Sequence, residues 1–236
     1  MSNVIEETRC DTCTAELDPG QTGLCEDCEH ARPRPFDELS DKAKQTAREK
    51  YTSSDYPGYD WWDGVYYDAV RMGQMLGIEI GTTSHAGRKP GTTYQTISIW
   101  FRGFCSQGDG ACFDGSYSFA PGAVKDIEQE TTDEELLRIA KELSLMQLTQ
   151  RLSGHEYFTA AIQSGNSNCI RTEIQDWGVD EIGEPDEEVF TRLMQGFADW
   201  IYKRLEDEHD YMCSDEYVDE QLSESDCMFD ESGAII

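Results

Sequence analysis

Two pairs of cysteines near the N-terminus constrain the fold of this chain more than any other feature. The pairs are Cys10-x2-Cys13 and Cys25-x2-Cys28, and eleven residues separate them. Each C-x-x-C knuckle can offer two thiolates to a tetrahedral ion, and the intervening loop is long enough to bring the second knuckle opposite the first. The spacing therefore predicts a zinc site, with two disulfides or four free thiols as the alternatives.

The predicted metal also explains how residues 1–35 can fold. This segment has too few apolar side chains to form a core, whereas structural zinc contributes roughly 10 to 16 kcal/mol of apparent binding energy in small finger peptides. Four thiolates leave no open coordination position, so the zinc is expected to be structural. His30 is the alternative ligand, and residues 31–35 form a short stiff linker. The predicted domains are residues 1–35, a four-cysteine zinc-binding module and linker, and residues 36–236.

Hydrophobic periodicity predicts the helices of the second domain. Apolar residues recur at helical spacing in residues 41–52, 62–76 and 132–147, and in a helix opened by Pro185, with a further helix near residues 214–223. The last long helix is expected to bury Phe190, Leu193, Met194, Phe197, Ile201 and Leu205. Gly77 is expected to end the second helix, and a capping box at Thr132 to begin the third.

Alternating polarity predicts the strands. They are expected at residues 78–80, 94–101 and 116–119, and as a hairpin of residues 157–163 and 169–177. Residues 81–93 are expected to form a polar, mobile loop. Strands bracketed by helices, with hairpin-length connections, predict an α+β fold: a mostly antiparallel sheet packed with several helices, preceded by the small zinc-ribbon-like module.

Negative charge gathers at the C-terminal end of the chain. The sequence holds 48 Asp and Glu against 19 Lys and Arg, a net charge of −29, and residues 205–236 carry twelve acidic residues with no Lys or Arg. Such a surface repels nucleic acid and anionic lipid at close range, so we expect no direct binding to either and a basic protein surface as the partner. Halophile adaptation and plain solubility are the alternative explanations.

The predicted partner-binding residues lie in this C-terminal region. They are Glu206, Asp207, Glu208, Asp210, Asp215, Glu216, Asp219 and Glu220. In a helix, several would be like-charge neighbours at i, i+4, and each such pair costs about 0.2 to 0.5 kcal/mol. Because the sequence tolerates this repulsion, we interpret the carboxylates as rows that can occupy a cationic groove in place of DNA or RNA.

Signatures of catalysis are scarce. The sequence contains no G-x-x-x-x-G-K-[ST], G-x-S-x-G or H-E-x-x-H motif. The best candidate is the glycine-rich loop of residues 106–114, where Cys105, Asp109, Cys112 and Asp114 crowd together. Its glycines fit close approach to a ligand, and equally a tight turn in which both cysteines are small buried hydrophobes. The prediction is therefore a protein that is not an enzyme.

Four phrases of the sequence resemble a family of proteins from phages and prophages. They are FDELSDKAK from Phe36, YDWWD from Tyr59, LGIEI from Leu76 and GFCSQGDGACF from Gly103, and the similarity runs from Phe36 to about Asp219. Most members of this family are labelled uncharacterised and some antitoxin-like, and the cysteine pairs are not part of the family's pattern. The resemblance implies a bacterial host cytoplasm during infection or lysogeny, which agrees with the lack of a signal peptide or of about 18 consecutive apolar residues.

Charge and resemblance together predict a non-enzymatic phage accessory protein. Its acidic surface is expected to bind and inhibit a basic, nucleic-acid-binding host protein, such as a restriction or CRISPR effector, by mimicking DNA. One alternative is an antitoxin that neutralises a basic toxin. The other is an enzyme that works from the loop of residues 106–114.

Overall fold

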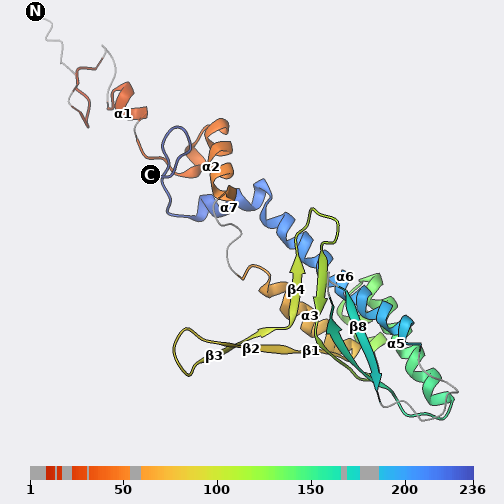
Figure 1. Cartoon of the computed structure of the whole chain (residues 1–236). Helices are drawn as coiled ribbons and strands as arrows, with labels where there is room; N and C mark the ends of the chain where they lie inside the picture. The colour runs from red at the N-terminus through yellow and green to blue at the C-terminus, as the bar shows by residue number, and fades with distance from the viewer. Residues whose placement is uncertain are drawn as a thin grey trace, which may run out of the picture. The chain divides into compact units, whose positions relative to one another are not determined.

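The chain packs as two compact units in the computed structural model (Figure 1). The structure describes residues 9–13, 15–17, 23–30, 32–53, 60–165, 169–175 and 186–236. Met1–Tyr59 together with His209–Ile236 form the terminal unit, and Asp60–Glu208 form the central unit. This grouping differs from the predicted boundary after residue 35, because the helix that follows the boundary packs against a helix near the C-terminus.

The terminal unit is built from short helices. They are α1 (Glu26–His30), the 3-10 helix η1 (Phe36–Glu38), α2 (Asp41–Ser53) and α7 (Asp215–Glu224). The helices predicted at residues 41–52 and 214–223 are confirmed as α2 and α7. Ser214 caps α7, since its side-chain oxygen accepts the backbone N–H of Tyr217 at 3.3 Å.

A small apolar core joins the two ends of the chain within this unit. Its buried side chains are Phe36, Leu39, Ala43, Ala47, Val218, Leu222 and Phe229. Phe36 and Phe229 meet edge to face with ring centroids 6.1 Å apart. The backbones of Arg34 and Phe229 exchange two hydrogen bonds of 2.9 Å. Gly233 has a φ of +85°, and a Cβ at this position would collide with the Ala43 carbonyl oxygen. Only glycine at position 233 therefore allows the C-terminal turn to lie this close to α2.

The central unit contains the three longest helices that the structure describes, together with one short helix. These are α3 (Asp63–Leu76), α4 (Ala123–Glu130), α5 (Glu134–Leu152) and α6 (Glu187–Met212), whose last residues continue into the terminal unit. Gly77 ends α3 with a φ of +87°, as predicted. The prediction that a capping box at Thr132 begins α5 was wrong. The N-cap of α5 is Asp133, whose carboxylate accepts the N–H groups of Glu135 and Leu136 at 3.0 Å.

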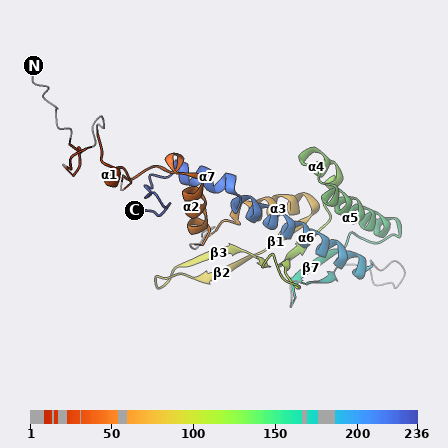
Figure 2. The ribbon, with the colours of Figure 1, turned by 90° about the horizontal axis from the view of Figure 1, so that it is seen from above.

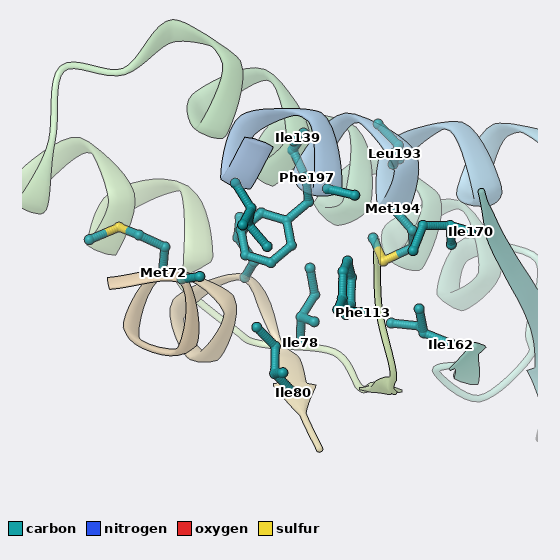
Figure 3. Packing of buried hydrophobic residues seen from close by; sticks show 14 of the residues in the cluster. Met72, Ile78, Ile80, Phe113, Ile139, Ile162, Ile170, Leu193, Met194 and Phe197 are labelled. Atoms are coloured by element: carbon teal, nitrogen blue, oxygen red, sulfur yellow. The ribbon is translucent and has the colours of Figure 1, made fainter. Parts of the chain in front are cut away.

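Helix α6 supplies much of the central core. All six residues predicted for its buried face are buried. Figures 1 and 2 show α6 running beside α3 and the sheet. In Figure 3, Phe197 and Met194 of α6 point toward Phe113, Ile162 and Ile170. The rings of Phe113 and Phe197 meet edge to face, with centroids 5.5 Å apart.

The main sheet has the strand order β1-β6-β7-β8, and each neighbouring pair is antiparallel. Its strands are β1 (Ile78–Ile80), β6 (Gly115–Tyr117), β7 (Thr159–Ser164) and β8 (Ile170–Gln175). Ile78 pairs with Tyr117, and both side chains are buried. The predicted α+β fold with antiparallel strands is confirmed.

Two further strand pairs correct the predictions for residues 81–101. The expected mobile loop contains β2 (Thr82–Ala86), which pairs with β3 (Thr93–Ile97), and β4 (Ile99–Arg102) pairs with β5 (Gly110–Phe113). The single strand expected at 94–101 is interrupted at Ser98, whose N–H donates to the Gly81 carbonyl at 2.9 Å. Strand β2 escaped prediction because neither of its faces is buried and its side chains are mostly polar, which leaves no apolar alternation.

Several expectations lie outside the described residues. They concern Pro185 as a helix start, Trp177 as a strand end, Ala31 in the linker and the middle of the loop between β7 and β8. Among the helices that the structure describes, none has the length and apolar character needed to cross a membrane.

Candidate metal centre and acidic surface

The four cysteines of the two knuckles come together in the terminal unit. The Sγ atoms of Cys10, Cys13, Cys25 and Cys28 all lie within 4.8 Å of one another, and Cys13 Sγ lies 3.4 Å from Cys25 Sγ. A tetrahedral ion with metal–sulfur bonds of about 2.3 Å holds its sulfurs roughly 3.8 Å apart. The thiols therefore lie close enough to bind one metal ion, as the spacing predicted.

Local backbone geometry sets up this cluster. The Asp11 N–H donates to the Gly23 carbonyl at 2.9 Å, which ties the first knuckle to the segment leading into the second. The Glu29 N–H donates to the Cys25 carbonyl at 2.9 Å, so Cys28 sits in the single turn of α1. Gly23 adopts a φ of +97°, a conformation that favours glycine. The side chain of His30, the alternative ligand, lies outside the described residues.

The thiols differ in their affinity for protons. Backbone N–H groups of Cys13 and then Cys25 lower the pKa of Cys10 to about 6, because they stabilise its thiolate. The pKa of Cys28 is raised, first by the side chain of Cys13 and then by that of Cys25. A bound cation would replace the shared protons, since metal ligation requires thiolates.

Arg34 anchors the cluster to the rest of the terminal unit. Its Nη2 donates to the Glu29 carbonyl at 2.9 Å, at the end of α1, while its backbone pairs with Phe229. Helix α1 is thereby tied to the small core. Four thiols held together in this way could bind an ion in a structural role.

The acidic residues of α7 form two rows with different surroundings. An α-helix turns by about 100° per residue, so Glu216, Glu220 and Glu224 lie on the side opposite the buried Val218 and Leu222. All three glutamates are exposed, and no ion pair or hydrogen bond joins their carboxylates to another described residue. We call these three residues the outward row.

Asp215 and Asp219 form the second row, which faces α2. The two Asp219 oxygens accept Arg48 Nε and Nη2 at 2.6 Å each, and Asp215 Oδ2 lies 3.6 Å from Arg48 Nη1. The hydrogen bond from Arg48 lowers the pKa of Asp219. Asp219 therefore holds α7 against α2, which differs from the partner-binding role predicted for it.

The acidic end of α6 is only partly exposed. Lys203 Nζ pairs with Glu206 at 2.9 Å and with Asp207 at 3.1 Å. Glu208 is half-buried, whereas Asp210 is exposed and lies 3.8 Å from His209 Nδ1. The eight predicted residues thus lie on two helices and do not all share one environment.

The sequence did not identify Arg48 as the residue whose side chain holds α7 in place. It lies 171 positions from Asp219, and no local pattern marks such a pairing. It also left Glu224 out of the partner-binding set, although i, i+4 spacing from Glu220 places it in the outward row.

The carboxylates of the glycine-rich loop of the central unit accept backbone N–H groups. Asp109 Oδ2 accepts the N–H groups of Cys105 and Ser106 at 2.8 and 2.6 Å. Asp114 Oδ1 accepts the Ser164 N–H at 2.6 Å. Cys112 is buried in β5, and burial is the main cause that raises its pKa. These contacts give both carboxylates a structural role, and the catalytic interpretation of the loop stays a hypothesis.

Comparison with known protein families matches residues 61–215 to a domain of unknown function, DUF8835. The match covers 155 of the 236 residues, or about two thirds of the chain. The chain belongs to the DUF8835 family. Neither the curated proteins nor the solved structures include a match. The family match corresponds closely to the central unit, so the cysteine cluster and nearly all of α7 lie outside it.

Proposed function

We propose that this DUF8835 protein is a non-enzymatic phage accessory protein that inhibits a basic, nucleic-acid-binding host protein. The observation that carries the proposal is the outward row of Glu216, Glu220 and Glu224 on an ordered helix. These carboxylates are exposed and unpaired among the described residues, while the opposite face of α7 is buried. The row is therefore available to a partner and held in a fixed array.

The spacing of the row supports contact with a cationic groove. Four residues of α-helix advance about 6 Å along the axis. Phosphates on one strand of duplex DNA follow one another about every 3.4 Å of axis. The row thus presents roughly half the charge density of one DNA strand, with more negative charge on the same segment at Asp226 and Glu231.

The stability of α7 also supports a functional reason for the row. Glu216 with Glu220 and Glu220 with Glu224 are two like-charge pairs at i, i+4, and each costs about 0.2 to 0.5 kcal/mol. The helix tolerates this cost because Arg48 and the apolar core hold it in place. Glu216 also lies in the first turn of α7, where a negative charge is favourable to the helix dipole, so the repulsion falls mainly on Glu220 and Glu224.

The metal in the proposal is zinc. A set of four cysteine thiolates is typical of closed structural zinc sites, and the geometry of the cluster fits such an ion. Its role would be to fold the N-terminal segment and attach it to the unit that displays the outward row. No chemical step of the proposed inhibition passes through the ion.

A titration of DNA digestion tests the proposed function. Purified protein is added to plasmid digests by a panel of restriction enzymes and CRISPR effectors. The account predicts that at least one nuclease is inhibited stoichiometrically, and that inhibition weakens as salt rises, because screening shortens the reach of the acidic field. Inhibition unaffected by salt, or none across the panel at large excess, contradicts the proposal.

The antitoxin hypothesis uses the same acidic row with a different partner, and the antitoxin-like labels in the resembling family favour it as second candidate. Co-expression with basic toxins separates the two. Rescue of growth against one toxin, without inhibition of any nuclease, would assign the row to toxin neutralisation.

A further inference from the structure

Helix α5 exposes three leucines on one side. Leu145, Leu148 and Leu152 are 65%, 49% and 89% exposed. Because an α-helix turns about 100° per residue, positions i, i+3 and i+7 lie within about 60° of one another. We call these three residues the leucine stripe.

The stripe lies on the face of α5 opposite the core. The side chains of Leu136, Ile139, Ala140, Leu143, Gln147 and Gln150 are buried on the inner face. The mean direction of these six side chains lies about 160° around the helix axis from the mean direction of the stripe. Packing of α5 onto its own unit therefore cannot bury the stripe, and a contiguous exposed apolar surface of this kind is typical of an interaction site.

The charge around the stripe restricts what can cover it. Helix α5 contains three acidic residues, Glu134, Glu135 and Glu142, and three basic ones, Arg138, Lys141 and Arg151, so its net charge is zero. The whole chain carries −29. Two copies of so acidic a protein repel each other over most of their surface, and they can approach closely only where local charge is balanced.

We propose that the leucine stripe is a homodimer interface in which α5 packs antiparallel against α5 of a second copy. A two-fold axis near Leu148 would place Leu145 opposite Leu152 of the second copy. The same register places Lys141 beside the C-terminal end of α5 of the second copy, four residues before Glu156. Glu156 is 82% exposed at its side chain and bonds Arg151 of its own chain at 3.0 Å. The stripe and the charges at its ends are thus self-complementary, as a two-fold interface requires.

The size of the contact sets the expected strength of the dimer. Residues 141–152 span about 18 Å of helix. Two such segments bury less than the roughly 800 Å² per partner of a standard interface. The dimer is therefore weak, with dissociation in the micromolar range. Salt should strengthen it, because screening removes the repulsion between the two acidic chains.

Sedimentation velocity of the full chain across concentration and salt tests the interface. Wild type is expected to pass from monomer to dimer as concentration rises, and at lower concentration in high salt. Leu148→Glu should raise the dissociation constant by tenfold or more, on the order expected when a charge is buried at the centre of an apolar contact. The matched control Tyr67→Glu replaces another exposed apolar residue, on α3, and should dimerise like wild type.

A charge exchange checks the register. Lys141→Glu alone should weaken the dimer, and adding Glu156→Lys should restore it in part. Circular dichroism confirms that each variant is folded. A chain that stays monomeric at hundreds of micromolar in high salt, or a Leu148→Glu variant that dimerises like wild type, overturns the proposal. Added salt should strengthen the dimer, whereas it should weaken nuclease inhibition. The two proposals can therefore fail independently of each other.

Discussion

The terminal and central units reach stability in different ways. The central unit buries residues of α3, α5, α6 and the main sheet in one continuous core. The terminal unit has a small core, and it adds the Arg48–Asp219 ion pair and a cluster of four cysteines. A small domain rarely buries enough apolar surface to be stable alone, so it needs such cross-links. The comparison suggests a rule that can be tested: charged groups and the cysteine cluster should matter most where the core is smallest.

The largest effect should follow from removing the metal. Replacing Cys25 with Ser should abolish binding of one zinc ion per chain and unfold the cysteine module, because structural zinc supplies roughly 10 to 16 kcal/mol of apparent binding energy. Elemental analysis in reducing buffer and hydrogen exchange of residues 9–30 measure this. All five tryptophans lie in the range of the central unit, so tryptophan fluorescence should stay unchanged. Much less than one zinc in the wild type contradicts the metal assignment.

The central core should be the next most sensitive. Phe197 is fully buried against Phe113 and stacks on Trp200 at 5.8 Å. Truncation to Ala should cost about 3 to 5 kcal/mol of unfolding free energy, because it leaves a cavity in a packed core. Urea denaturation followed by tryptophan fluorescence measures the loss, with Tyr67→Ala as the exposed control. A loss below about 1 kcal/mol would mean that the site collapses or is not packed as described.

The Arg48–Asp219 pair should matter less, and its contribution should depend on pH. Arg48→Ala should destabilise α7 by about 1 kcal/mol, a value reduced for the partial exposure of Asp219. Because Arg48 lowers the pKa of Asp219, the contribution is present above the ordinary Asp pKa of about 3.9 and is lost as pH falls through the lower folded value. Hydrogen exchange of α7 amides measures the difference between wild type and variant at pH 6 and pH 3. A difference that does not shrink at pH 3 argues against the pair.

The smallest effect is expected for an ion pair on the surface of the central unit. Arg138 bonds Glu135 and Glu142 at 2.6 Å, but all three side chains are more than 40% exposed. Arg138→Ala should cost a few tenths of a kcal/mol, roughly the value of exposed helical pairs. Urea denaturation in low and high salt checks this, and a loss as large as that of Arg48→Ala would remove the distinction drawn between the two units.

Local patterns predicted the parts of the fold that depend on local physics. The apolar period of α6 identified its buried face, and C-x2-C spacing identified the cysteine cluster. Non-local pairings escaped prediction. The neighbouring positions of β1 and β6, and the contact between Arg48 and Asp219, join segments far apart in sequence. Within the acidic region, charge alone could not separate Asp219, which supports α7, from Glu220, which faces outward.

The most direct test of the account measures nuclease inhibition by two variants of equal charge. Glu216→Gln, Glu220→Gln and Glu224→Gln together remove the outward row. Asp126→Asn, Glu128→Gln and Glu173→Gln together remove three exposed charges from the central unit. The account predicts that the first variant loses inhibition of the nuclease that wild type inhibits. Its α7 should stay folded, because relief of two like-charge pairs, worth about 0.4 to 1 kcal/mol, offsets the loss of the favourable charge of Glu216 in the first turn. The second should inhibit like wild type. Equal inhibition by the two variants would contradict the assignment of the outward row as the binding surface.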